Sequence, residues 1–112
     1  MIQVGVRRDL RGRIRHLSCS GHARFDPEGG VDVVCAGVSA LLGALAIGLT
    51  QVVGAPVSLL AGDGRLRVQV PARMPEDLAG PVQVLLETTV LALHGIQENY
   101  QGSLKIRWLR PR

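Results

Sequence analysis

A cysteine and a histidine lie close together in the segment SGHARFDPEGGVDVVCAGVSAL, residues 20–41. A thiol attacks a peptide carbonyl as its thiolate, and a neighbouring imidazole can take the thiol proton and later return it to a leaving amine. His22 and Cys35 have the side chains for those two roles. Cys35 also stands where a long apolar run begins. If a helix starts there, its dipole and unpaired amides favour a thiolate and can receive a developing oxyanion.

Two polar residues flank the cysteine and have two interpretations each. Asp32 is a natural helix N-cap, worth ~1 kcal/mol, because its carboxylate can accept the exposed amides of the first turn. It could also orient the imidazole or bind substrate, and both roles can hold together. Ser39 lies four residues after Cys35, so it shares that helical face. Its hydroxyl could hydrogen-bond near the thiol or back to a helix carbonyl.

Non-catalytic interpretations of the thiols remain open from the residues alone. A buried cysteine often serves as a small apolar side chain. Cys19 could form a disulfide with Cys35, or Cys19, His22 and Cys35 could bind a metal. A fourth ligand is not evident, since His16 and His94 are isolated in the sequence. The N-terminus lacks the apolar core of a signal peptide, so we expect reduced thiols, no metal and no cofactor.

The patterning around this segment predicts the elements that position it. Alternation of apolar and polar residues indicates strands at 2–6, 13–19, 57–61, 65–70 and 104–108. The turn GDG joins the third and fourth of them as a hairpin. A helix should follow Asp32, run to about Val53 and stop at Gly54. A second helix should begin with Pro75 in its first position and reach about Tyr100, although Gly80-Pro81 could delay its start.

The resulting order, β-β-α-β-β-α-β, predicts an α+β fold. Strands that come as hairpins indicate an antiparallel five-stranded sheet with one wet face, and both helices should pack on the other face. With 112 residues, of which 46% are hydrophobic and 20% charged, the chain has the size and composition of a single globular domain spanning residues 1–112.

Charge and apolarity raise two further possibilities. The net charge is +4, and the basic residues Arg7, Arg8, Arg11, Arg13 and Arg15 fall at the predicted first hairpin. A solvated hairpin surface is the simpler interpretation; the alternative is a non-catalytic ribosome-associated module that binds RNA or protein through it. No aromatic residue stands among these arginines for base stacking, and direct RNA contact stays open.

Residues 33–53 carry no charge, but glycines interrupt them and no basic or aromatic anchors flank them, so we expect a core helix and no membrane.

The sequence of residues 20–41 resembles that of the ribosomal-processing cysteine protease family, Prp. The motif positions read Gly21-His22-Ala23, then Gly30-Val31-Asp32, two valines, Cys35-Ala36-Gly37, Val38 and Ser39-Ala40. The ending LHGIQENYQGSLKIRW is also similar to the family's last helix and strand, so the resemblance covers nearly the whole chain.

This resemblance implies a cysteine endopeptidase that removes an N-terminal extension from a large-subunit ribosomal protein during ribosome assembly. Cys35 would be the nucleophile and His22 the general base and acid, with Asp32 and Ser39 supporting the site. A mobile loop would consist of Arg24, Phe25, Asp26, Pro27, Glu28, Gly29 and Gly30. The family's small α+β fold forms homodimers, and its work places the protein in the cytoplasm. Pro27 suggests a stiffer loop than a Gly-rich lid, and Cys19 is not expected from the family pattern.

Overall fold

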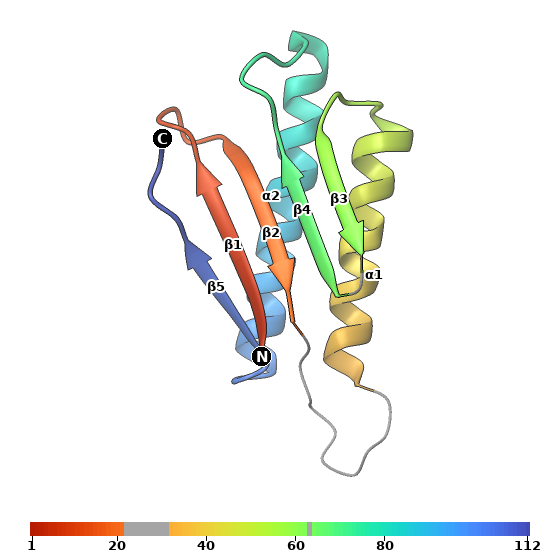
Figure 1. The fold of residues 1–112 in the computed structure, drawn as a ribbon, viewed down its shortest axis with the longest axis vertical. Coiled ribbons are helices and arrows are strands. Elements are labelled where there is room, and N and C mark those ends of the chain that lie inside the picture. The colour runs from red at the N-terminus through yellow and green to blue at the C-terminus, as the bar shows by residue number, and fades with distance from the viewer. Residues whose placement is uncertain (22–31, 63) are drawn as a thin grey trace.

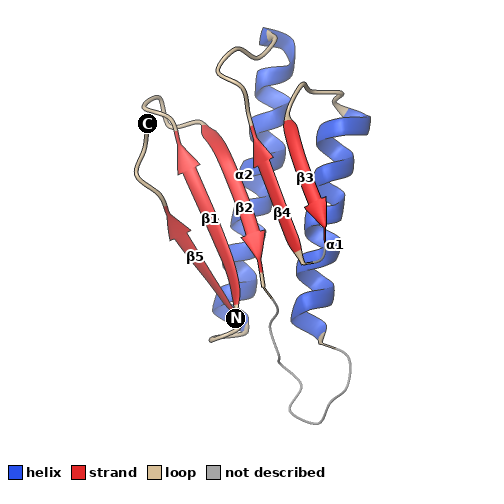
Figure 2. Ribbon diagram, viewed as in Figure 1, coloured by secondary structure: helices blue, strands red, loops and turns tan. Residues whose placement is uncertain are grey.

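Five strands form one sheet in a computed structural model that describes residues 1–21, 32–62 and 64–112. In chain order they are β1 (Ile2–Arg8), β2 (Ile14–Ser20), β3 (Ser58–Gly62), β4 (Arg65–Gln69) and β5 (Leu104–Trp108). Their order across the sheet is β3-β4-β2-β1-β5 (Figure 1). Two long helices, α1 (Val33–Ile47) and α2 (Glu76–Asn99), lie on one face of this sheet, and the other face is uncovered (Figure 2).

The sheet is mixed, which corrects the prediction of a purely antiparallel one. β1 pairs with β2 in antiparallel fashion, but β1 and β5 run parallel, with Ile2 opposite Leu104 and Val6 opposite Trp108. The helices explain this arrangement. In chain order α2 follows β4 and precedes β5, and it runs back along the full length of the sheet. β5 therefore starts at the same end as β4 and β1 (Figure 1). Alternation of apolar and polar residues is the same in both kinds of strand pair, so the sequence pattern does not separate them.

Helix boundaries differ from the predictions in three places. The first helix ends as an α-helix at Ile47 and continues as one π-helical turn, η1 (Gly48–Val52), which stops before Gly54 as expected. Pro75 is the N-cap of α2 and not its first helical residue. Gly80-Pro81 does not delay the helix, because α2 begins at Glu76 and Pro81 lies within it.

The core fills the space between the sheet and the helical layer. Val4, Leu17 and Val68 point from the sheet toward the helices and are almost fully buried. α1 contributes Val34, Val38, Leu42 and Leu45, and α2 contributes Val82, Leu86, Val90 and Leu93. α1 is therefore a core helix that buries one face against the sheet.

Gly48 lets the end of the first helix approach α2. A Cβ atom at this position would lie 3.1 Å and 3.2 Å from the two methyl carbons of Leu85. That is closer than carbon atoms normally pack, so the glycine sets the interhelical spacing.

Two helical stretches, Val33–Val52 and Glu76–Asn99, are long and apolar enough to cross a membrane by length and composition. Core helices of folded proteins pass the same test. Here both stretches pack side by side on the sheet, where they bury Val38 and Leu86 against it.

Candidate active site

The first turn of α1 holds Cys35 in the position that the sequence predicted. Asp32 is the N-cap, with extended backbone, and its Oδ1 atom accepts a hydrogen bond of 3.0 Å from the Cys35 amide. Cys35 is therefore the third helical residue, in the turn whose amides begin the helix. The cap role of Asp32 is confirmed, and it fixes the backbone that carries the sulfur.

The Cys35 side chain opens onto a groove of about 330 Å³. One wall is α1, which contributes Cys35, Val38, Ser39 and Leu42, so the structure brings Ser39 into the same groove as the thiol. The opposite wall is the tip of the β3–β4 hairpin, where Gly62, Gly64 and Arg65 line the space, while Ile2, Cys19 and Gly21 close one end. An open groove between a helix start and a hairpin tip suits an extended peptide better than a compact small molecule.

Cys19 shares this groove but differs from Cys35 in its chemistry. It is buried on β2, with 6% of its surface exposed, and both cysteines are free, so the disulfide interpretation is wrong for this structure. Burial, together with the neighbouring Cys35, raises the pKa of the Cys19 thiol to about 11. Cys19 is therefore protonated near neutral pH, and Cys35 is the candidate nucleophile of the pair.

His22 and the predicted mobile loop, Arg24 to Gly30, lie outside the described residues. The residue just before His22 is described. Gly21 has φ of 98°, and a Cβ atom there would come within 2.7 Å of the Met1 carbonyl oxygen. Glycine is thus required where the chain leaves β2, at the end of the groove that holds Cys35.

The sequence of the chain matches one known protein family. The family described as cysteine protease Prp matches residues 1–105, which is nearly the whole chain. The chain belongs to the Prp family of cysteine proteases. The predicted family and the predicted enzyme class, a cysteine-type endopeptidase, are thereby confirmed.

Solved structures share the fold. The essential ribosomal processing protease Prp from S. aureus, in complex with a covalently linked product peptide, superposes with a TM-score of 0.82 at 22% identity, over 97% of this chain and 100% of that one. The same S. aureus protein with a substrate peptide gives a TM-score of 0.79 at 22% identity, with the same two coverages. SMU.848 from Streptococcus mutans gives 0.80 at 27% identity, over 98% of this chain and 95% of that one. No curated protein sequence gives a significant match.

The hairpin side of this Prp groove was not predicted from the sequence. Arg65 is its charged wall residue among the described ones, and Gly62 and Gly64 beside it keep the wall low. The GDG turn was visible in the sequence as a hairpin signal. Its position opposite Cys35 depends on the path of the chain from β2 through α1 to β3. No local sequence pattern predicts that path.

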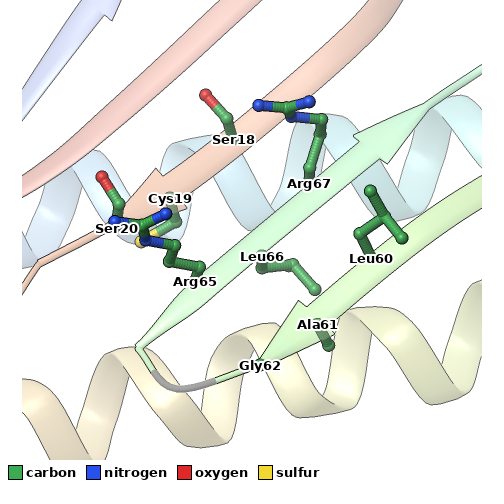
Figure 3. Close-up of a pocket in the computed structure, with 9 residues that line it drawn as sticks. All are labelled: Ser18, Cys19, Ser20, Leu60, Ala61, Gly62, Arg65, Leu66 and Arg67. Atoms are coloured by element: carbon green, nitrogen blue, oxygen red, sulfur yellow. The ribbon is translucent and has the colours of Figure 1, made fainter.

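A larger hollow, about 740 Å³, lies on the uncovered face of the sheet. Ser18, Ser20, Arg65 and Arg67 project into it, away from the helices (Figure 3). This hollow does not include Cys35. The smaller groove is the candidate active site of the Prp protease because it contains the thiol at the helix start.

The basic hairpin that the sequence offered as an RNA- or protein-binding surface is partly neutralised. Asp9, in the β1–β2 turn, accepts hydrogen bonds from the Arg11 and Arg13 amides at 2.8 Å and 3.0 Å. Its Oδ2 atom lies 3.3 Å from Arg13 and 3.7 Å from Arg15. Arg8 pairs with Glu87 on α2.

The described residues contain no cluster of three metal-ligating side chains, and His22, the third candidate ligand, lies outside them.

Proposed function

We propose that this Prp protease cuts its substrate with a Cys35–His22 dyad and that the substrate is the N-terminal extension of a large-subunit ribosomal protein. The observation that carries the dyad is the position of Cys35. Its thiol stands in the first turn of α1 and opens onto a groove whose end is formed by Gly21, the residue that precedes His22 in the chain. Asp32 and Ser39 would support the site, the former by holding the Cys35 amide.

The chemistry follows from these placements. The Cys35 thiolate attacks the carbonyl carbon of the scissile bond and forms a C–S bond, while the charge on the carbonyl oxygen is received by first-turn amides. The C–N bond then breaks, and the leaving amine takes a proton from the His22 imidazolium. Water, deprotonated by His22, attacks the thioester and releases the new carboxyl end with the thiol regenerated.

The ribosomal substrate draws support from relatives of the same fold. The S. aureus protein is a ribosomal processing protease observed with a substrate peptide and with a covalently linked product peptide. This work belongs to the cytoplasm, where large-subunit proteins are made and assembled. Two free cysteines agree with a reducing compartment.

Peptide cleavage tests the dyad and the substrate together. The purified protein is incubated with a peptide spanning the extension of the ribosomal protein from the same organism, and mass spectrometry locates the cut. We expect Cys35→Ala and His22→Ala to lower the cleavage rate by about a thousandfold or more. Cys19→Ala is the matched control and should stay within a few fold of the wild type. Cleavage that survives Cys35→Ala would refute the dyad, whereas a dyad-dependent enzyme that ignores this peptide would refute only the substrate.

We also propose that the protein is a homodimer through its helical layer. The outward side of α1 carries Val33, Ala36, Ala40, Ala44 and Ile47, all exposed and none of them polar. Val84 and Leu91 of α2 are 64% and 72% exposed. An uncharged stripe of small and aliphatic residues is what two copies need for close packing.

Sedimentation velocity of two charge variants tests this dimer. Ala40→Glu places a charge in the middle of the stripe and should convert the dimer to monomer. Gln3→Glu adds the same charge on the sheet face and should leave the dimer intact. A wild-type protein that sediments as a monomer at micromolar concentration would rule the dimer out.

A further inference from the structure

The uncovered face of the sheet carries a set of positive charges that have no ion-pair partner among the described residues. Buried and outward positions alternate along each strand, so the outward ones are identified by their neighbours in the core. Five basic residues occupy outward positions: Arg7 on β1, Arg65 and Arg67 on β4, and Lys105 and Arg107 on β5. Among the described residues, no aspartate or glutamate stands on this face. We call these five residues the sheet-face cations.

Three acids of the described chain contact basic residues away from this face. Asp9 contacts Arg13 and Arg15 at the β1–β2 turn, Glu87 holds Arg8, and Glu98 lies 3.4 Å from His94. None of the sheet-face cations forms an ion pair with a described residue. Their field is felt locally. His16 faces outward opposite Arg7 on β1 and Gln69 on β4. Burial lowers its pKa, a hydrogen bond with Gln69 opposes that shift, and the charges of Arg7 and Arg67 lower the pKa further.

Four of the sheet-face cations stand in two rows, one on β4 and one on β5, and Arg7 stands on β1 between them. The β4 row and the β5 row are separated by β2 and β1, which puts the rows about 14 Å apart at ordinary strand spacing. The floor between the rows carries Gly5, Ser18 and Ser20. A Cβ atom at Gly5 would lie 2.8 Å from the Ser18 Oγ atom, so the floor has no room for a larger residue there. The 740 Å³ hollow occupies the β4 side of this trough (Figure 3).

We propose that this face binds the phosphate backbone of single-stranded RNA laid in the trough. Arginine, four of the five cations, matches phosphate oxygens with its planar fork of donors. Ser18 and Ser20 offer hydroxyls to sugar and phosphate oxygens between the rows. The described part of the face has no Phe, Tyr or Trp side chain, and the one imidazole there, His16, is half-buried. We therefore expect little base stacking and little sequence preference.

Other occupants fit this face less well. A second copy would bring two sets of five positive charges together, which opposes dimerisation here. A membrane surface needs apolar side chains that insert, and Leu60 is the exposed large apolar residue on the described part of the face. An acidic peptide would need side-chain pockets for specificity, and the floor around Gly5 is filled by Ser18 and by the Leu109 side chain.

Fluorescence anisotropy with a labelled 20-nucleotide oligouridylate tests the proposal. Five phosphate contacts predict a slope of about −3.5 for log affinity against log salt concentration, or roughly a hundredfold loss of affinity between 50 and 200 mM KCl. Arg67→Gln/Arg107→Gln should reduce that slope to about −2.1, or roughly a twentyfold loss over the same range. Arg11→Gln/Arg73→Gln removes equal charge away from the face and should leave the slope unchanged.

Several results would overturn the proposal. One is the absence of RNA binding at 50 mM KCl, and another is equal weakening by the two double variants, which would mean diffuse attraction to a basic protein. Competition by polyglutamate at equal charge concentration would identify an acidic protein as the partner. Stronger co-sedimentation with phosphatidylserine vesicles than binding to RNA would identify a membrane as the partner. Tighter binding of the deoxyuridine 20-mer than of the oligouridylate would identify DNA. Peptide cleavage by Arg67→Gln/Arg107→Gln should match the wild type, which keeps RNA binding distinguishable from the proteolytic function.

Discussion

Substitution of Asp32 separates the two roles that this residue can have. Its carboxylate accepts the Cys35 amide at 3.0 Å, a capping hydrogen bond that alanine cannot make and asparagine can. Asp32→Ala should therefore lower the free energy of unfolding by about 1 kcal/mol, and Asp32→Asn by only a few tenths. With a urea dependence of about 1.5 kcal/mol per molar, the alanine variant should unfold roughly 0.7 M earlier.

The same variants report on the site when the alkylation rate of Cys35 is measured beside the urea midpoint. Loss of the cap frays the first turn of α1, so Asp32→Ala should slow alkylation of Cys35, while Asp32→Asn keeps the amides in place and should retain the rate. An Asp32→Ala protein as stable as the wild type would refute the capping argument. A full-stability Asp32→Asn protein that no longer cleaves peptide would show that the carboxylate charge itself acts in the reaction.

Three further outcomes follow from the described contacts. At pH 7.5 iodoacetamide should modify Cys35 in the folded protein and spare Cys19, whose thiolate fraction at a pKa of about 11 is only ~3 × 10⁻⁴; peptide mapping showing equal labelling would contradict this. The pKa of Asp9 is lowered, because hydrogen bonds from Arg13 and Arg11 outweigh the opposing effect of burial; its stabilisation is present above about pH 4 and lost as pH falls through the folded pKa. Asp9→Asn should thus destabilise the protein at neutral pH and converge with the wild type in acid denaturation, and a constant difference at all pH values would argue otherwise. Gly48→Val should cost about 2 kcal/mol in thermal unfolding because its side chain collides with Leu85, and an unchanged midpoint would show that the helices move apart freely.

Local signals in the sequence were enough for the elements and for the start of the active-site helix. Alternation marked all five strands, the Asp32 carboxylate marked the N-terminus of α1, and Gly54 marked the end of the helical stretch that η1 completes. These features depend on neighbouring residues only, so the sequence contains them directly. The Gly21–His22 and Asp32–Cys35 spacing likewise pointed to the Prp family, which the match over residues 1–105 confirms.

The tertiary structure decided how these elements face one another. The parallel pairing of β1 with β5 depends on the length and direction of α2, not on any residue in either strand. Arg65 opposes Cys35 because the chain crosses over the sheet before it forms the β3–β4 hairpin, and Cys19 lies beside Cys35 for the same reason. Five cations from three strands gather on one face only once those strands are aligned in register. Each of these juxtapositions joins residues far apart in the chain, and packing of the helical layer on the sheet is the physical cause that brings them together.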